Sequence, residues 1–485
     1  MLHLARQTSA IVAVLVACAL IAVAPAHAAA ATASVLPDVV SKVLARHKIP
    51  ETAVSAYVAQ VGSTTPLLAV NADIPRNPAS VIKLVTTFVA LEALGPAYQW
   101  RTEAYLDGRL DGGDLKGDLL LKGYGDPYLV TERLWLLERE LRNHGVRNIN
   151  GDLVIDDSWF AREELDPGAF DGQAYRAYNA LPDALLVNFQ AMNFTFRPDA
   201  ARGRVQIVTE PALANLEIRN QMRLIRGGCG SGKSSISMVV GNDLTRPRVT
   251  FSGALASQCP EYELPRSILD GPTFAYGVFR SLWEEQGGHL AGGLRRGQVP
   301  PGKAPVVTFL SPPLAEVIRS VNKFSNNVMS RQIFLTTGAE LYGAPGNLEK
   351  GQRATLATLA RLGLVFPELE IGNGSGLARE TRISAGSLGK LLLAARSSRF
   401  SAEFKASLSL AGLDGTTRRR FRGNSLAGEM HLKTGTLNGV TSIAGYVRSE
   451  SGPEYVVVLL VNGARATWGG GQEAQDALLA WVHRR

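Results

Sequence analysis

The sequence predicts an α+β fold, in which helix-rich and strand-rich stretches follow one another as blocks. A helical pattern opens at Asn77, and strand-like segments separated by turns then dominate residues 101–251. Helical patterns return over 314–362 and 473–482, with two strands between them over 442–461. Blocks of this kind are typical of α+β proteins with several domains, and we expect the middle of the chain to be mainly β.

Length and composition exclude several classes of protein. The chain has 485 residues, which suggests about three domains of ordinary size. Hydrophobic residues make up 46% and charged residues 19%, so the chain can bury a sizeable core and is not mainly disordered. Three cysteines exclude a scaffold held mainly by disulfides. The net charge of +8 fits a solvated surface, and it also leaves open contact with a membrane surface or with anionic wall polymers.

The N-terminus has the pattern of a signal peptide over residues 1–28. Arg6 precedes an apolar run over 11–23, and residues 25–28 end in an Ala-x-Ala cleavage site. A lipoprotein cleavage box over 15–18 is an alternative, but the chain stays apolar where a lipid anchor would need a polar tether. An uncleaved membrane anchor is a third interpretation of the N-terminus. No other stretch approaches the roughly 18 apolar residues of a membrane span, so we expect an exported, soluble protein of the periplasm.

Helix signals are clearest at the start of the first block. Asn77 is a good N-cap, Pro78 suits the first helical position, and Gly95-Pro96 ends the pattern. Further helices are predicted over 274–286, 314–329, around Glu340, 351–362 and 473–482.

The strand-rich block alternates short apolar runs with turns. Asp111-Gly112-Gly113 is a turn signal, while Leu119–Leu121, Leu153–Ile155 and Val249–Phe251 are apolar runs of strand length. A Gly/Pro-rich link over 287–305 then marks a domain boundary.

Cys229 and Cys259 are the only cysteines outside the signal peptide. In an oxidising compartment they could form a disulfide, although their spacing alone leaves this open. A metal site is not expected at either one, because no His or second Cys stands beside it at ligand spacing.

Two residues at the start of the first helix could act as a nucleophile and its base. Ser80 and Lys83 are three residues apart, which places both side chains on one helix face. A neutral lysine amine can activate a serine hydroxyl, and the free N–H groups of a helix N-terminus suit a developing oxyanion. The pattern alone is weak, because the same spacing occurs twice more, at Ser320/Lys323 and Ser387/Lys390.

Two further motifs strengthen the case, because they follow in order along the chain. Ser325-Asn326-Asn327 is a Ser-x-Asn motif, and Lys433-Thr434-Gly435 is a Lys-Thr-Gly motif on an apparent strand. Ser-x-x-Lys, a Ser-Asn motif and Lys-Thr-Gly together are the signature of penicillin-binding proteins and class A β-lactamases.

With these motifs the chain resembles the class C low-molecular-mass penicillin-binding proteins, the D-alanyl-D-alanine carboxypeptidase/endopeptidase family. The gap from Ser80 to Ser325 is much longer than that from Ser325 to Lys433, as expected for a family with two domains inserted between the first two motifs. Asn373 and Ala378 replace the first and last residues of the family's Asp-Gly-Ser-Gly-Leu-Ser. We expect that segment to lie outside the catalytic core. Other segments that fit are 123–127, 373–377 and 411–416.

The resemblance implies a serine β-lactamase/DD-transpeptidase-like catalytic domain, an antiparallel sheet flanked by helices, with two nested and mainly β inserted domains. We expect the catalytic domain to be split between the two ends of the chain. The expected order is a signal peptide 1–28, catalytic domain 29–99, domain II 100–170, nested domain III 171–263, domain II 264–304 and catalytic domain 305–485.

The resemblance also implies a role for each motif residue. Ser80 would attack the carbonyl between two D-alanines, Lys83 would take its proton, and the Ser325 hydroxyl would relay that proton to the leaving amine. Asn327 would hydrogen-bond the substrate backbone and Lys83. Lys433 would keep the pocket electropositive and lower the pKa of Lys83.

Substrate contacts are implied around these residues. The backbone N–H groups of Ser80 and Thr436 would form the oxyanion hole, and Thr434 would donate to the terminal carboxylate. Asp156 would reach an ammonium group of a diaminopimelate-containing peptide, or else would be an ordinary strand-end residue. The remaining substrate-binding candidates are Gly435, Asn438 and Arg379.

These roles describe a serine D,D-peptidase that hydrolyses D-alanyl-D-alanine bonds and D-alanyl-diaminopimelate cross-links of peptidoglycan through a Ser80 acyl-enzyme. Its partners would be stem peptides and β-lactam antibiotics, and no metal or organic cofactor is implied.

The alternatives are a β-lactamase and a peptidoglycan-binding scaffold with a silent site. Class A deacylation uses Glu-x-x-Leu-Asn, and Thr434 stands in place of that Glu before Leu437-Asn438. A long-lived penicillin adduct is therefore expected. The balance of the two peptidase activities, the third stem residue and the oligomeric state stay open.

Two further sequence patterns are typical of other functions: a phosphate-loop match and a run of arginines. Gly227–Ser234 matches a phosphate-binding loop, but residues 235–240 alternate like a strand, so we expect a loop between two antiparallel strands and no nucleotide. Arg418-Arg419-Arg420 with Arg422 is a basic run that fits either a solvated loop or attraction to anionic wall material. No nucleic-acid-binding module is present, so nucleic acid is not an expected partner.

Overall fold

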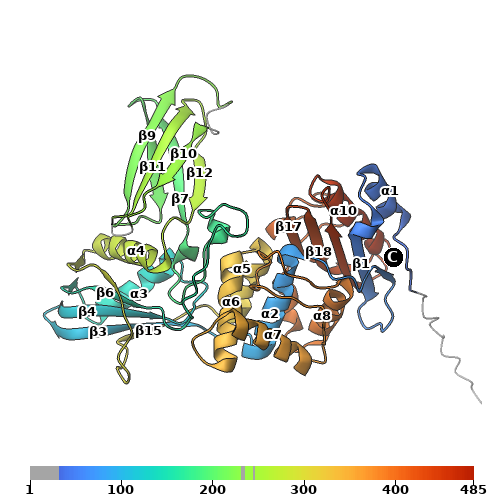
Figure 1. The fold of residues 1–485 in the computed structure, drawn as a ribbon, viewed down its shortest axis with the longest axis horizontal. Coiled ribbons are helices and arrows are strands. Elements are labelled where there is room, and N and C mark those ends of the chain that lie inside the picture. The colour runs from blue at the N-terminus through green and yellow to red at the C-terminus, as the bar shows by residue number, and fades with distance from the viewer. Residues whose placement is uncertain (1–31, 231–234, 244–245) are drawn as a thin grey trace, which may run out of the picture.

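The computed structural model describes residues 32–230, 235–243 and 246–485. The predicted signal peptide and part of the glycine-rich loop after Gly230 lie outside these described residues. Three sheets organise the chain (Figure 1). Among the described residues, no helix is long and apolar enough to cross a membrane.

The first sheet joins the two ends of the chain. Its six strands pair antiparallel throughout, and Val54 of the first strand lies opposite Val461 of the last. This pairing makes one sheet from an N-terminal and a C-terminal piece, as expected for a split catalytic domain. In spatial order the strands are β16 (Ser409–Leu410), β17 (Met430–Leu437), β18 (Val440–Arg448), β19 (Glu454–Asn462), β1 (Val54–Gln60) and β2 (Leu68–Val70).

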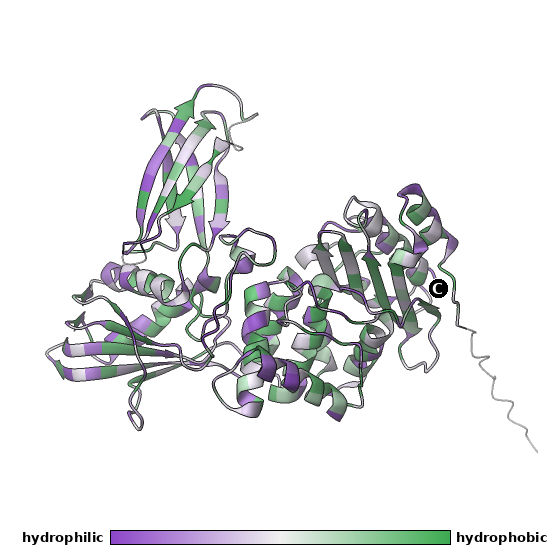
Figure 2. Ribbon diagram, viewed as in Figure 1, coloured by the Kyte–Doolittle hydropathy of each residue, from purple (hydrophilic) through white to green (hydrophobic). Residues whose placement is uncertain are grey.

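Helices cover both faces of this sheet, whose central strands are strongly hydrophobic (Figure 2). On one face α1 (Asp38–Arg46) and α10 (Gly470–His483) share a core with the strands. A second core lies between the other face and a larger helical layer. That layer holds α2 (Lys83–Leu94), α5 (Leu314–Phe324), α6 (Asn327–Tyr342), α7 (Leu348–Arg361), α8 (Ala385–Ser397) and α9 (Ser401–Ala406).

The predicted helix over 314–329 is wrong, because two helices meet inside it. Ser325 adopts the left-handed conformation, with φ of 60°, which ends α5. Asn326 then caps α6 by accepting a hydrogen bond from the Met329 amide. The break falls within the predicted Ser-x-Asn motif: Ser325 and Asn326 lie between the helices, and Asn327 begins α6.

The second sheet lies in the middle of the chain and packs against α3 (Thr131–Asn143) and α4 (Gly271–Glu285). The turn predicted at Asp111-Gly112-Gly113 joins its two longest strands, and both glycines have positive φ. Its strands are β13 (His289–Leu290), β5 (Asn148–Ile149), β4 (Asp114–Gly123), β3 (Arg101–Asp111) and β15 (Val307–Leu310), with β6 (Leu153–Asp156) and β14 (Leu294–Arg296) beside them.

The third sheet stands away from the helical layer (Figure 1). Cys229 and Cys259 form a disulfide, a pairing that their spacing in the sequence could not decide. Beyond the glycine-rich loop, a strand begins at Ser237. The strands on either side of that loop, β9 and β10, run antiparallel as predicted, although β11 lies between them, because β11 is parallel to β9 and antiparallel to β10. The strands are β10 (Ser237–Val240), β11 (Arg248–Ala256), β9 (Glu217–Ile225), β8 (Arg204–Glu210), β7 (Met192–Asp199) and β12 (Tyr262–Arg266).

Strand pairing runs past two of the predicted domain boundaries. β12 pairs with β7 through Arg266, beyond the predicted end of the nested domain at residue 263. β15 pairs with β3 as far as Leu310, beyond the predicted boundary at 304. The chain therefore leaves the second sheet at Leu310, because backbone hydrogen bonds and not glycine content mark the end of a sheet. Short 3₁₀ turns lie at η1 (Glu51–Ala53), η2 (Ala79–Ile82), η3 (Ala177–Asn179), η4 (Asn188–Gln190) and η6 (Gly415–Thr417).

Candidate active site

Ser80 lies in η2, the 3₁₀ turn that leads into α2, and this turn is pressed against β17. Ser442 of β18 donates a hydrogen bond of 2.6 Å to the Pro78 carbonyl oxygen. A Cβ on Gly435 would lie 2.9 Å from the Ser80 nitrogen, so only glycine permits this approach. The predicted helix start is thus shifted: Asn77 accepts from the Ala79 amide at 2.8 Å, and the regular helix begins at Lys83.

The side chain of Lys83 is fully buried next to Ser80. Its Nζ lies 2.9 Å from Ser80 Oγ and 2.7 Å from Asn327 Oδ1, and it also donates to the Ser375 carbonyl oxygen. Among the described residues no carboxylate pairs with it. A neutral amine has two hydrogens and one lone pair. The two carbonyl oxygens can take both hydrogens, and the lone pair is then free to accept the Ser80 hydroxyl proton.

Burial and two nearby cations act together on Lys83. Burial is the largest cause that holds the pKa of Lys83 well below its usual range, and the charges of Lys433 and Arg331 lower it further. Burial also lowers the pKa of Lys433 to about 7 and that of Arg331 to about 10. The site therefore favours a neutral Lys83, which is the form that a general base requires.

Ser325 and Lys433 form the second half of the site. Lys433 Nζ donates to Ser325 Oγ at 2.8 Å and to the Thr434 carbonyl oxygen at 2.9 Å. The preceding turn of α5 is fixed by Lys323, which donates to Asp414 at 2.5 Å and to the Leu408 carbonyl oxygen at 2.9 Å. The Ser325 hydroxyl is thus held beside a lysine that can exchange a proton with it.

The remaining candidates on β17 lie along the rim of the site. Thr434 donates a hydrogen bond of 2.9 Å to the hydroxyl of Thr416, which the sequence analysis had not assigned to the site. Thr436 is exposed one residue beyond Gly435, and Asn438 is exposed in the turn between β17 and β18.

The segment 373–378 touches the base, although it was expected to lie outside the catalytic core. Its Ser375 carbonyl accepts from Lys83, and its Gly374 carbonyl accepts from Thr86 and Ser330, each at 2.7 Å. Asn373 closes the turn, accepting from the Ser375 hydroxyl at 2.8 Å and donating to the Leu377 carbonyl at 3.0 Å. An aspartate could accept but not donate here, which gives the departure at Asn373 a structural role.

Asp156 does not reach the site, so its predicted role in substrate binding is wrong. Its side chain is only 1% exposed at the end of β6. Its oxygens accept from Ser158 and from the Val299 amide at 2.9 Å, and Lys122 Nζ lies 3.1 Å away. These hydrogen bonds lower the pKa of Asp156 against the effect of burial. Asp156 is the strand-end residue of the alternative interpretation.

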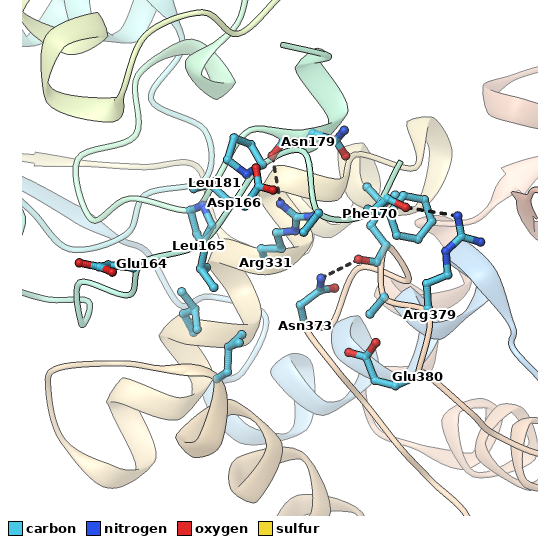
Figure 3. A pocket seen from close by; sticks show the side chains of 17 residues that line it. Glu164, Leu165, Asp166, Phe170, Asn179, Leu181, Arg331, Asn373, Arg379 and Glu380 are labelled. Carbon is cyan, nitrogen blue, oxygen red and sulfur yellow. Dashed lines mark hydrogen bonds between the residues drawn. The ribbon is translucent and has the colours of Figure 1, made fainter. Parts of the chain in front are cut away.

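Arg379 lines a pocket of about 340 Å³ beside the site (Figure 3). Its guanidinium donates to the Phe170 carbonyl oxygen at 3.2 Å and lies 4.6 Å from the Phe170 ring. The opposite wall comes from residues 164–182, which also contact the catalytic helices: Asn327 Nδ2 lies 3.4 Å from the Tyr178 carbonyl oxygen. The pocket is also lined by Glu164, Asp166 and Glu380.

The two other Ser-x-x-Lys pairs are occupied elsewhere. Ser387 donates to Glu368 at 2.6 Å, and Lys323 pairs with Asp414. Only Ser80 and Lys83 come together with the other two motifs. Among the described residues, no group of His, Cys, Asp and Glu side chains is arranged to hold a metal ion.

Three residues of the site were missed by sequence reasoning. Ser375 acts through its backbone carbonyl, which every residue type has. Thr416 lies far from Thr434 in sequence and meets it through the short pairing of β16 with β17. Arg331 did carry a signal, because it stands four residues after Asn327 on α6 and therefore on the same helix face.

The fold and the site define a serine hydrolase of the penicillin-binding class, in which a buried lysine adjoins the nucleophile. The chain belongs to the D-Ala-D-Ala carboxypeptidase 3 (S13) family, whose sequence profile matches residues 36–485. The resemblance drawn from the motifs is thereby confirmed, and the protein is a serine peptidase of the kind that acts on peptidoglycan.

Individual relatives agree with this assignment. The chain is 30% identical over 391 residues to the D-alanyl-D-alanine carboxypeptidase of Actinomadura sp. (strain R39), covering 78% of this chain and 71% of the relative. It is 24% identical over 419 residues to D-alanyl-D-alanine carboxypeptidase DacB of Haemophilus influenzae, covering 86% and 87%. The crystal structure of penicillin binding protein 4 (dacB) from Haemophilus influenzae has the same fold, with a TM-score of 0.78 at 22% identity over 93% of this chain and 100% of that one.

Gly435→Ala is expected to slow penicillin acylation of Ser80 by about 100-fold, because displacing a reacting group by about 1 Å has an effect of that size. The added Cβ would lie 2.3 Å from Ser442 Oγ and 2.7 Å from the Pro78 carbonyl oxygen. Stopped-flow acylation with a chromogenic cephalosporin measures the rate. Gly463→Ala is the control, since its Cβ would meet only Ala53 at 3.5 Å. Equal rates for both variants would contradict the packing argument.

Arg331→Met is expected to move the acidic limb of the acylation pH profile to higher pH. Acylation needs neutral Lys83, and the rate falls as pH drops through the pKa of that lysine. The Arg331 charge lowers this pKa. Removing that charge therefore raises the pKa of Lys83, and the acidic limb moves to higher pH with it. Arg331→Lys keeps the charge and should leave the limb in place. An unmoved limb in the methionine variant would show that Arg331 does not act on Lys83.

Proposed function

We propose that this protein is a serine D,D-peptidase that hydrolyses D-alanyl-D-alanine bonds and D-alanyl cross-links of peptidoglycan stem peptides through a Ser80 acyl-enzyme. One observation carries the proposal: Ser80 Oγ lies 2.9 Å from the Nζ of a fully buried lysine that has no carboxylate partner among the described residues. The relatives supply the substrate class, since two of them are named D-alanyl-D-alanine carboxypeptidases.

In the proposed acylation step, neutral Lys83 takes the proton from the Ser80 hydroxyl, and Ser80 Oγ attacks the D-alanyl carbonyl carbon. The developing oxyanion is stabilised by the backbone N–H groups of Ser80 and Thr436. As the C–N bond breaks, the leaving amine takes a proton from the Ser325 hydroxyl, and Ser325 in turn receives the proton that Lys83 took from Ser80, while Lys433 holds Ser325 Oγ at 2.8 Å. Lys83 is then neutral again. Ser80 is then an ester, and the leaving amino acid or peptide departs as an amine.

In the proposed deacylation step, a water molecule attacks the ester carbonyl and Lys83 accepts its proton. The C–O bond to Ser80 breaks, and the serine oxygen recovers a proton from Lys83. Asn327 keeps Lys83 in place throughout, because its side-chain oxygen lies 2.7 Å from Nζ. A β-lactam would follow the same first step, and its ring-opened adduct would persist where water is poorly placed to attack.

Substrate binding is proposed at both ends of the site. Thr434 and Thr416 would donate hydroxyl protons to the terminal carboxylate, and Lys433 would add positive charge. Gly435 and Asn438 would line the peptide along β17. Arg379 would bind a carboxylate of the stem peptide in the adjacent pocket. Glu164, Asp166 and Glu380 lie in the same pocket and offer carboxylates to an ammonium group, the role expected earlier of Asp156.

Ser80→Ala is expected to abolish the penicillin adduct, which intact-mass spectrometry and peptide mapping of the wild-type protein should place on Ser80. Lys83→Met should slow acylation about a thousandfold, because a positioned general base contributes effects of that order. Ser387→Ala, from an occupied Ser-x-x-Lys pair, should still form the adduct. Wild-type protein without any adduct would overturn the proposal, and rapid turnover of penicillin without an adduct would favour a β-lactamase.

Export is proposed because peptidoglycan lies outside the cytoplasm and residues 1–28 have the pattern of a signal peptide. Protein recovered from the periplasm of an expressing bacterium should begin at Ala29 on intact-mass analysis. An uncleaved N-terminus, or a lipid mass on Cys18, would replace this expectation with one of the two anchored forms.

A further inference from the structure

The leaving-group side of the cleft can be located from the contacts around β17. Under the proposed function, the leaving amine is protonated from Ser325, whereas the oxyanion lies at Ser80 and Thr436. Ser325 is bonded to Lys433, and Thr434 is bonded to Thr416. The leaving group therefore departs on the side of the site where Ser325, Thr434 and Thr416 lie, and not on the side of Thr436.

A cationic loop follows directly on this side. Thr417 is buried, and after it Arg418, Arg419 and Arg422 are exposed. Within the described part of the chain these three guanidinium groups have neither an ion pair nor a side-chain hydrogen bond. Three unpaired cations within five residues form a local positive surface that begins two residues after Thr416. We call these three residues the arginine loop.

The arginine loop is held in place by its fourth arginine. The side chain of Arg420 turns inward, bonding Gln475 Oε1 at 3.0 Å and Asp476 Oδ1 at 2.8 Å, both on α10. The Arg420 amide also donates to the Thr417 carbonyl oxygen at 2.9 Å. One arginine thus anchors the turn to α10, while its three neighbours are exposed.

Nearby carboxylates do not neutralise the arginine loop. Asp414 is paired with Lys323, and Glu429 is paired with Arg448 at 2.7 Å. Asp476 is paired with the inward Arg420. The positive charge of the three exposed arginines is therefore available to a ligand.

Exposed apolar side chains lie close in sequence to Thr416 and Ser325. Leu413, three residues before Thr416, is 62% exposed, and Phe324, directly before Ser325, is 70% exposed. Phe324 also lines a pocket of about 440 Å³ with Tyr128 and Arg319. Large exposed apolar side chains beside unpaired cations are features of a binding surface rather than of plain solvated loops.

The two substrate types differ in what leaves on this side. Carboxypeptidase cleavage releases a single D-alanine, whose one carboxylate is met by Thr434 and Thr416, and a single residue spans only about 3.5 Å. Cleavage of a cross-link releases an amine that belongs to a second stem peptide. That peptide continues for several residues and carries further carboxylates, so it extends beyond Thr416.

We infer that the arginine loop is a subsite for the acidic second peptide of a cross-link, so that this cleft selects cross-linked peptidoglycan over free D-alanyl-D-alanine ends. The inference rests on the proposed function. The reaction is unchanged: the bond from the D-alanyl carbonyl to the amine of the second peptide breaks, and that amine takes the proton. Arg418, Arg419 and Arg422 act on the binding of the departing peptide.

The test compares two substrates on matched variants. The loop variant carries Arg418→Ser, Arg419→Ser and Arg422→Ser. The control variant carries Arg353→Ser, Arg399→Ser and Arg484→Ser, which removes the same charge from exposed arginines elsewhere on the chain. For each protein, kcat/KM is measured on a purified cross-linked muropeptide dimer and on a monomer that ends in D-alanyl-D-alanine. Penicillin acylation of Ser80 reports that each variant is folded.

The ratio of dimer to monomer kcat/KM should fall about tenfold in the loop variant and stay at the wild-type value in the control, as expected for several weakened charge contacts. Raising salt from 50 to 300 mM should lower the wild-type ratio and leave that of the loop variant flat. An unchanged ratio in the loop variant, or an equal fall in the control, would overturn the subsite. Wild-type protein that forms no adduct at Ser80 would instead overturn the proposed function itself.

Discussion

The structure depends on keeping one buried lysine uncharged. Lys83 is enclosed by oxygen atoms that accept hydrogen bonds but carry no charge, and two cations stand close enough to lower its pKa further. A carboxylate at this point would hold the proton on the amine and remove the base. Burying basic side chains without an acid destabilises the fold, and the apolar cores on both faces of the first sheet must offset that cost. Activity and stability are therefore opposed at the same few residues.

The site is assembled from segments that are distant in sequence, and each of them is locally constrained. Ser80 lies in a turn that Gly435 and Ser442 hold against β17. Ser325 lies at the junction of two helices, where its left-handed backbone turns its hydroxyl toward Lys433. The loop at Asn373 is bound to α2 and α6 through the Gly374 carbonyl. Ser80 and Ser325 thus lie where a specific turn replaces a regular helix, whereas Lys83 and Lys433 lie on the regular elements α2 and β17.

The sequence was informative where chemistry restricts the residue type. Serine, lysine and asparagine at set spacings identified both the site and the family, and hydrophobic patterning identified several of the helices, among them α2, α4 and α7. It was uninformative where the backbone or a distant partner decides. A left-handed serine at 325 leaves no mark on an apolar helical pattern, so one long helix was predicted. The contact of the Ser375 carbonyl with Lys83 could not be predicted either, because every residue type has a backbone carbonyl. Asp156 looked accessible because its partners Lys122 and Val299 come from strands and loops far along the chain.

The pairing of β1 with β19 also fixes when the protein can become active. The two strands lie about 400 residues apart in sequence, and the second and third sheets are encoded between them. Closing so long a connection is slow compared with forming hairpins such as β3–β4, so the middle of the chain can fold before the first sheet is complete. A chain emerging from its N-terminus presents Ser80 early, but it lacks Lys433 and the strand that braces β1 until its last segment has emerged. Hydrolytic competence is thereby delayed to the end of synthesis.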